Sequence, residues 1–518
     1  MSLVSIDLGT TNMKVQAYDH AFKKLWSASR AVVYDREGKF VEFDAEKYFD
    51  DLAAMLKELS QSGVIAAGEK CHITLTGQAE SLVVLDKNYK PLMNAISWMD
   101  ERSQEECEYI STLVTDEECY QVTGQCAVLP TWPATKILWL QKNRPEVYNN
   151  AHQYVLLKDY IVYRLSGQLL CECSIATFSF YFDIHNRCYW KKMLDIIGVK
   201  EEQLPDFVEP GTDLGALCPE AAEKTGLSNA TVNVGTLDHF AGMIGTGNIK
   251  PGIVTESTGT VMAMSIMADL PIDPNETAAL HYGPFPGTYV FLPVCESGGI
   301  SLGWFRDRFL PGVEFDEINR VLGERGISPE LLFLPYINGT NAPEFDAKAS
   351  GLFMGLKTRH DAYDMAGAVR EGVALIQDRI LQTLANKPVS IISTGGGAKS
   401  PLWLQMKADI TGIEVKVPED KEAALLGTAI MGAVSAGGNQ ALGQNVSQTA
   451  AHRNGIHMGS EYMDVLGGFL DPTDIHHRAG EDHVHAVLFA GTVSGQSQIQ
   501  DLIAVQVILG ADLKKRRF

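Results

Sequence analysis

Apolar and polar residues follow two periods along the chain, and together they predict an α/β protein. An apolar run from Leu3 stops at a glycine turn and resumes beyond it, which is typical of two strands joined by a hairpin. Residues 45–59 and 361–385 instead place apolar side chains on one helical face, and Asp44 stands where it would cap the first of these helices. Strands and helices therefore alternate from the start of the chain.

A second hairpin repeats the opening pattern about half a chain later. Gly9 lies in the first turn, and Gly259 lies between two threonines in the second. This similarity indicates a duplicated domain. Further on, "VSIISTGGGAKSPLW" predicts a buried strand, a triple glycine, and a helix with Ser400 as N-cap and Pro401 at its first position.

Size and charge narrow the class of protein. A chain of 518 residues is expected to form two or more domains. Its formal net charge of −21 argues against nucleic acid or an anionic membrane surface as a partner. No run reaches the roughly 18 apolar residues that span a bilayer, and nine cysteines without a C-x-x-C pair suit a reducing compartment. We expect a cytoplasmic protein.

The periodic pattern is lost after about Gly437. Six of the 13 histidines lie between His452 and His485, in a segment with no strong period. These histidines could bind metal, or they could simply be solvated. We treat 438–518 as a separate tail of atypical sequence.

The first hairpin turn carries residues suited to phosphate. Backbone N–H groups and the hydroxyls of Thr10 and Thr11 could hold phosphate oxygens, and Asp7 could face Mg²⁺. An ordinary hairpin would need only Gly9. The matching turn at 258–260 favours the phosphate interpretation.

Asp238 lies where a strand gives way to a helix. It could be a helix N-cap, or it could act as a general base that takes a proton from an attacking hydroxyl. Its neighbour His239 could be a base as well, although a histidine at a helix start more often packs.

Two short segments, "GQAES" and "WMDER", could form a sugar site. Gln78, Glu80 and Trp98 combine an amide, a carboxylate and a ring, a set that suits a polyol. Asp100 and Arg102 could join them. Alternatively, Asp100 and Arg102 form a charged surface pair and Trp98 belongs to the core.

The motifs taken together resemble the FGGY family of carbohydrate kinases over residues 2–437. They are "DLGTT", "W-x-D-x-R", "KDY", "LDHFAGMIGTG", "STGT", "TGGGAKSPLWLQMKADITG" and "EAALLGTA". The resemblance implies two actin-like, ribonuclease H-like domains, 1–246 and 247–437, with ATP and a sugar in the interdomain cleft. Family relatives commonly form dimers, so the resemblance also implies a homodimer.

The resemblance also implies roles for individual residues. Asp238 is the implied catalytic base, and Asp7 the implied Mg²⁺ ligand. The implied sugar-binding residues are Gln78, Ala79, Glu80, Trp98, Asp100, Arg102, Asp238 and His239. The implied ATP-binding residues are Thr10, Thr11, Lys14, Thr258, Gly259, Thr260, Gly396, Gly397, Ala398 and Ser400.

The sugar signature departs from those of the family. Xylulokinases usually carry "GQMHG" where this chain has "GQAES", so Glu80 replaces the histidine. Glycerol kinases carry a glutamate there, but the arginine of their "QRET" motif is Ala79 here. We expect a ketopentose such as xylulose as substrate, with glycerol, another polyol or a hexulose as alternatives. A non-catalytic sugar sensor and a chaperone-like or filament-forming ATPase of the same fold are the other classes considered.

Overall fold

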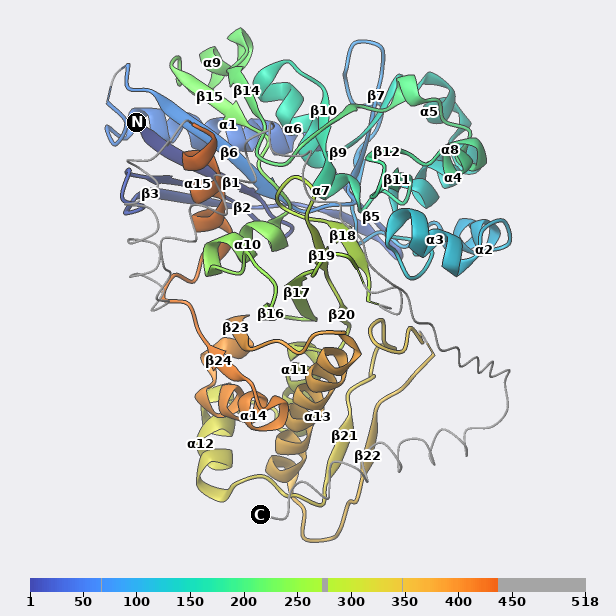
Figure 1. The fold of residues 1–518 in the computed structure, drawn as a ribbon, viewed down its shortest axis with the longest axis vertical. Coiled ribbons are helices and arrows are strands. Elements are labelled where there is room, and N and C mark those ends of the chain that lie inside the picture. The colour runs from blue at the N-terminus through green and yellow to red at the C-terminus, as the bar shows by residue number, and fades with distance from the viewer. Residues whose placement is uncertain (67, 273–277, 347, 437–518) are drawn as a thin grey trace. The chain divides into compact units, whose positions relative to one another are not determined.

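The computed structural model describes residues 1–66, 68–272, 278–346 and 348–436 (Figure 1). The tail predicted over 438–518, with its histidines, lies outside the described residues. Within the described part, the protein is mixed α/β with several sheets, and no helix there is both long enough and apolar enough to cross a membrane.

The first large sheet has six strands in the order β14-β15-β6-β1-β2-β3. Its strands are β1 (Ser2–Leu8), β2 (Asn12–Tyr18), β3 (Lys24–Ala31), β6 (Cys71–Gly77), β14 (Asp213–Ala216) and β15 (Ala230–Asn233). Strand β1 is antiparallel to β2 and parallel to β6. Helix α1 (Ala45–Gln61) packs on the sheet, and Asp44 caps it by accepting a hydrogen bond from Lys47 N at 3.0 Å, as predicted.

The second large sheet has seven strands and includes the second hairpin. Its order is β18-β19-β17-β16-β23-β24, with β20 paired to β17. The strands are β16 (Ile253–Thr258), β17 (Met262–Met267), β18 (Leu280–Tyr282), β19 (Tyr289–Phe291), β20 (Val294–Cys295), β23 (Ser390–Gly395) and β24 (Glu414–Lys416). The long predicted helix is α13 (Ala362–Thr383), with Asp361 as its N-cap.

The two sheets repeat one strand order, and each sheet contains one of the two glycine turns. In the first sheet the order β3-β2-β1-β6-β15 has two antiparallel pairings followed by two parallel ones. The order β19-β17-β16-β23-β24 in the second sheet has the same pairings. The glycine turns at Gly9 and Gly259 occupy equivalent places, each between the two central antiparallel strands.

Two small-residue helices that follow these sheets cross at close range. They are α10 (Asp238–Thr246), which follows β15, and α15 (Ala423–Ser435), which follows β24. A Cβ atom on Gly245 would lie 1.9 Å from Ala423 O, and one on Gly427 would lie 1.8 Å from Ala241 O. Each helix thus leaves no room for a side chain on the glycine of the other helix. The crossing therefore requires glycine at both positions.

The remaining elements surround these sheets. A five-stranded sheet comprises β4 (Asp35–Glu37), β5 (Phe40–Phe43), β8 (Ala95–Ile96), β7 (Leu82–Leu85) and β9 (Gln153–Leu156). Two-stranded sheets pair β10 (Leu170–Glu172) with β13 (Asp206–Val208), β11 (Phe182–Asp183) with β12 (Cys188–Tyr189), and β21 (Leu332–Leu334) with β22 (Leu352–Met354). The other helices are α2 (Gln104–Ser111), α3 (Asp116–Thr123), α4 (Pro133–Asn143), α5 (Pro145–Asn150), α6 (Leu157–Ser166), α7 (Cys173–Ala176), α8 (Lys191–Ile197), α9 (Pro219–Thr225), α11 (Gly299–Phe309), α12 (Phe315–Arg325) and α14 (Pro401–Thr411), with short 3₁₀ turns η1 (Glu201–Gln203) and η2 (Gly397–Lys399).

Candidate active site

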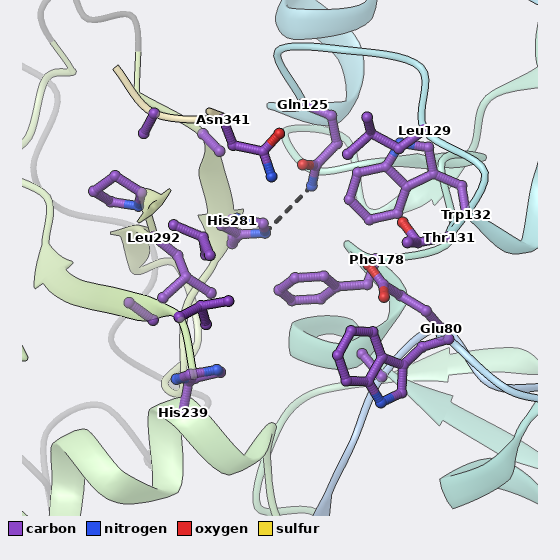
Figure 2. A pocket seen from close by; sticks show the side chains of 18 of the residues that line it. Glu80, Gln125, Leu129, Thr131, Trp132, Phe178, His239, His281, Leu292 and Asn341 are labelled. Atoms are coloured by element: carbon purple, nitrogen blue, oxygen red, sulfur yellow. Dashed lines mark hydrogen bonds between the residues drawn. The ribbon is translucent and has the colours of Figure 1, made fainter. Parts of the chain in front are cut away.

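A pocket of about 330 Å³ brings together several of the predicted site residues (Figure 2). Those that line it are Thr10, Gln78, Ala79, Glu80, Trp98, Asp238 and His239. Its other wall comes from the second half of the chain and includes Val261, His281, Glu296, Asn341 and Phe345. The pocket therefore contains a residue from each glycine hairpin turn, Thr10 and Val261.

Asp238 is the first residue of α10, and its carboxylate borders the pocket. Leu237 occupies the N-cap position and makes no side-chain cap hydrogen bond. Asp238 Oδ1 accepts a hydrogen bond from His239 N at 2.6 Å. Asp238 is therefore not the N-cap residue, and its carboxylate lies beside the space that a ligand could enter.

Gln78 and Trp98 connect the pocket to the first hairpin turn. Gln78 Nε2 donates to Gly9 O at 3.3 Å, and its Oε1 accepts from Ser81 Oγ at 2.8 Å. Trp98 Nε1 donates to Thr10 Oγ1 at 2.9 Å. The indole ring is thus fixed at the pocket wall and also orients a hydroxyl of the turn.

Asp100 and Arg102 lie outside the pocket lining, in contrast to their predicted sugar contacts. Arg102 binds Asp100 through Nε (2.8 Å) and Nη2 (2.7 Å), and Nη2 also reaches Glu42 at 2.7 Å. Asp100 Oδ2 accepts a further bond from Val41 N at 2.6 Å. The surface-pair alternative is wrong, because both side chains are buried. The pair supports the segment that carries Trp98.

Asp7 lies in β1 opposite Lys14 of β2, one residue before the first turn. Its Oδ1 is out of contact with solvent and has no hydrogen-bond partner within the described part of the chain. Burial raises the pKa of Asp7 to about 7; the charges of Asp238 and Glu422 also raise it, and Lys14 opposes them. An oxygen left unpaired in this way fits a bound cation or its hydration shell.

Lys14 itself makes a contact that the sequence did not predict. Its Nζ lies 2.6 Å from Glu422 Oε2, at the start of α15. This ion pair joins residues 408 positions apart in the chain. The predicted phosphate contact of Lys14 would require its ammonium to leave Glu422 or to share it.

The second turn rests on the start of α11. Gly259 O accepts from Gly299 N at 2.8 Å, and Thr260 O accepts from Ile300 N at 3.1 Å. Thr260 is exposed at the turn. Thr258, in contrast, is buried, and its hydroxyl binds Glu256 and Lys407 in the protein interior. The Thr258 hydroxyl therefore already has hydrogen-bond partners within the protein. The backbone of Thr258 still leads into the turn.

The triple glycine lies beside this second turn. Gly395 is the register partner of Thr258, and a Cβ atom on Gly397 would lie 2.7 Å from Thr258 Cβ. Gly396 is exposed, and Ala398 is half-buried in the 3₁₀ turn that follows. Ser400 caps α14 as predicted, accepting from Trp403 N at 3.3 Å, and it donates to Asn319 at 2.7 Å. Ser400 is therefore a structural cap.

One wall of the pocket consists of residues that were not predicted from the sequence. His281 stacks on Phe178 with ring centroids 4.4 Å apart, and its Nδ1 lies 3.3 Å from Gln125 Nε2 (Figure 2). On the same wall, Asn341 Nδ2 donates to Glu296 Oε1 at 2.6 Å. None of these residues stands in a recognisable motif. They come from separate segments that only the folded chain brings together.

His281 should make stability depend on pH. Burial, with a smaller contribution from the nearby His239, lowers the pKa of His281 to about 3, against an unfolded value of 6.5. The contribution of His281 to the free energy of unfolding is fully present above pH 6.5. It falls as the pH drops toward 3, because in this range only the unfolded chain takes up the proton. The loss is at most about 1.4 kcal/mol per pH unit. Urea unfolding of the wild type and His281→Phe at pH 7, 6, 5 and 4 measures it.

The phenylalanine variant keeps a ring against Phe178 and removes the titrating group. Gln125 Nε2 retains a partner in this variant because it also donates to Thr177 O at 3.0 Å. The variant should therefore lose less stability than the wild type between pH 6.5 and 4. Equal losses in the two proteins would show that His281 does not contribute to the pH dependence.

Comparisons with known proteins agree with this arrangement. Residues 2–245 match the N-terminal domain of the FGGY family of carbohydrate kinases, and residues 259–436 match the C-terminal domain of that family. The chain is 31% identical over 444 residues to a xylulose kinase of Staphylococcus epidermidis, covering 84% of this chain and 88% of that protein. It is 27% identical over 491 residues to a gluconokinase of Bacillus licheniformis, covering 90% and 95%.

A solved structure agrees as well. The ligand-bound xylulose kinase from Lactobacillus acidophilus superposes with a TM-score of 0.78 at 25% identity, covering 90% of this chain and 97% of that one. The predicted family is therefore confirmed, and with it the prediction of a sugar kinase. The chain belongs to the FGGY family of carbohydrate kinases.

Proposed function

We propose that this kinase transfers the γ-phosphoryl group of ATP to a hydroxyl of a ketopentose such as xylulose. The observation that carries the proposal is the pocket itself, which combines Asp238 with Gln78, Glu80 and Trp98 and reaches a residue of each glycine turn. Rings that cover C–H faces and carboxylates that accept from hydroxyls suit a polyhydroxylated ligand. The xylulose kinases among its relatives support the same substrate class.

In this proposal, residues 1–246 and 247–437 form two actin-like, ribonuclease H-like domains with the reaction in the cleft between them. The repeated strand order supports the two domains, since each contains one glycine hairpin. The walls of the pocket come from both halves of the chain, which supports the cleft.

Asp238 acts as the general base. Phosphoryl transfer depends mainly on positioning and on neutralising charge, so the protein has little covalent chemistry to perform. Asp238 accepts the proton of the attacking hydroxyl as its oxygen forms the new bond to the γ-phosphorus, while the bond from that phosphorus to the bridging oxygen breaks and ADP leaves. Gln78, Glu80 and Trp98 orient the sugar, and His239 borders it at the helix start.

The two turns and the triple glycine bind ATP. Thr10, Thr11, Gly259 and Thr260 offer backbone N–H groups and hydroxyls to the phosphates. Gly396, Gly397 and Ala398 lie against the adenosine, where glycine allows close approach. Thr258, Ser400 and Lys14 act mainly as supports for these segments, since each already has a partner within the protein.

Asp7 is the proposed ligand of Mg²⁺. The unpartnered Oδ1 fits this role, and Mg²⁺ usually binds one or two carboxylates and keeps several waters. When bound, the ion neutralises phosphate charge in the transition state. The described residues contain no cluster of three or more His, Cys, Asp or Glu side chains that could hold a metal ion, so Asp7 would bind it together with waters and phosphate oxygens.

The charge of the pocket favours an uncharged sugar over a sugar acid such as gluconate. Glu80, Asp238 and Glu296 line it, and no Lys or Arg stands among its described lining residues. A carboxylate ligand would meet like charges without a compensating cation. The gluconokinases among the relatives share the fold, but this lining disfavours their substrate.

A phosphorylation assay with a panel of sugars tests the proposal. ATP consumption is measured with xylulose, ribulose, a hexulose, glycerol and gluconate, each beside a sugar-free control. Xylulose or ribulose should give the largest stimulation and gluconate none. Strong turnover with gluconate would contradict the substrate class. Hydrolysis that no sugar stimulates would favour an ATPase of another kind, and binding without product would favour a sensor.

A further inference from the structure

Lys136 of α4 is a fully buried lysine behind the wall of the pocket. Its Nζ donates to Thr131 O at 2.6 Å and to Ser97 O at 2.8 Å, and lies 3.4 Å from Glu80 O. An ammonium has three protons, so these carbonyls use its whole donor capacity. No carboxylate forms a salt bridge with Lys136 in the described part of the chain.

The three carbonyls belong to three different segments of the pocket wall. Glu80 and Thr131 line the pocket directly, and Ser97 is followed by Trp98, which also lines it. These segments are separated in sequence by 56, 39 and 5 residues from Lys136. One side chain therefore fixes the backbone of all three.

The backbone at Glu80 needs such support. Its φ of +65° lies in the left-handed region, which residues other than glycine rarely adopt. Such a conformation persists when surrounding contacts enforce it. The hydrogen bonds from Lys136 to Glu80 O, Ser97 O and Thr131 O help to hold Glu80 in this conformation.

The charge of Lys136 also acts on the Glu80 carboxylate. Burial raises the pKa of Glu80, the ammonium opposes that rise, and Asp238 adds to it. Burial lowers the pKa of Lys136, with Glu80, Asp100 and Cys107 opposing this effect and Arg102 adding to it. Removal of the ammonium would thus leave Glu80 more readily protonated.

We propose that Lys136 is a positioning residue for sugar binding, which holds three segments of the pocket in register and so keeps the Glu80 side chain oriented toward its ligand. This inference rests on the proposed function for the identity of the ligand. The arrangement of the three segments does not depend on it.

The test compares Lys136→Met with Lys158→Met. Lys158 is also buried, pairs with Glu172 at 2.7 Å and does not line the pocket. Lys136→Met should raise the KM for the sugar about tenfold or more, as expected for lost hydrogen bonds to a charged group, and leave the KM for ATP near the wild-type value. It should also raise the pH at which kcat/KM for the sugar increases. Lys158→Met should lose stability without either change.

Amide hydrogen exchange gives a readout that needs no substrate. Segments 78–81, 96–98 and 129–132 should exchange faster in Lys136→Met than in Lys158→Met. If the wild type phosphorylated no sugar but these segments still exchanged faster in Lys136→Met, the positioning role would stand and the proposed function would be rejected. Unchanged exchange and sugar KM in folded Lys136→Met would overturn the inference.

A second variant covers the case in which Lys136→Met does not fold. Lys136→Met/Glu80→Gln removes both charges and avoids an uncompensated buried carboxylate. Its sugar KM should exceed that of Glu80→Gln alone, because the three carbonyls have still lost their donor. Equal KM values for the two variants would contradict the proposal.

Discussion

Asp238→Asn is expected to lower kcat by about 10²–10⁴-fold while ATP still binds. The amide keeps the shape of the carboxylate and cannot take a proton from the attacking hydroxyl. The loss should appear in kcat, since the role of the base is realised in the transition state. Single-turnover assays with the best sugar of the panel, together with nucleotide titrations, measure both quantities.

Stability separates this role from a structural one. The charge of Asp238 raises the pKa values of Asp7 and Glu80, because the Asp238 carboxylate repels each of these two carboxylates. Removing one charge should therefore leave the protein as stable as the wild type or more so, as is common at active sites. Asparagine caps a helix about as well as aspartate, so a purely capping residue would tolerate Asp238→Asn without loss of turnover. Asp238→Ala would then destabilise the protein by about 1 kcal/mol.

Asp195→Asn serves as the control, because Asp195 is exposed on α8 and is not among the residues that line the pocket. It should leave both turnover and stability near wild-type values. If Asp238→Asn kept near-normal turnover and lost stability, Asp238 would be a structural residue at the helix start.

Local features of the fold were predictable from the sequence because their causes are local. The cap at Asp44 and the cap at Ser400 each depend on residues within three positions. The two glycine turns likewise need only their own segments. The order of the remaining strands in the two sheets was not predicted, because it depends on pairings between segments that are far apart in the chain.

Features that depend on distant partners were not predictable in this way. Asp100 and Arg102 have the spacing of a surface pair, and only the positions of Val41 and Glu42 show that they are buried. The hydroxyl of Thr258 looks available in the sequence, but Lys407 lies 149 residues away. The wall formed by His281 and Asn341 has the same origin, because segments that are far apart in the chain meet at the pocket.

Lys407→Met is expected to destabilise the protein by about 3–5 kcal/mol, because it leaves the buried carboxylate of Glu256 without its counter-ion. Lys407 Nζ lies 2.9 Å from Glu256 Oε2 and 3.0 Å from Thr258 Oγ1, and both charged side chains are 0% exposed. Ser393 Oγ also donates to Glu256 Oε2, at 2.6 Å. The neutral hydroxyls of Ser393 and Thr258, which both donate to Glu256, cannot replace the lost ammonium. Urea unfolding at pH 7 measures the loss.

The double variant Lys407→Met/Glu256→Gln identifies the cause of that loss. It should recover a large part of the stability, because no unpaired charge stays buried. Lys416→Met is the matched surface control: its partner Glu414 is exposed, so the change should stay within about 0.5 kcal/mol. The pair also orients Thr258, which leads into the second turn, so Lys407→Met should raise the KM for ATP more than that for the sugar. If the double variant were no more stable than the single one, the loss would come from packing around Lys407, and the buried charge on Glu256 would not be its cause.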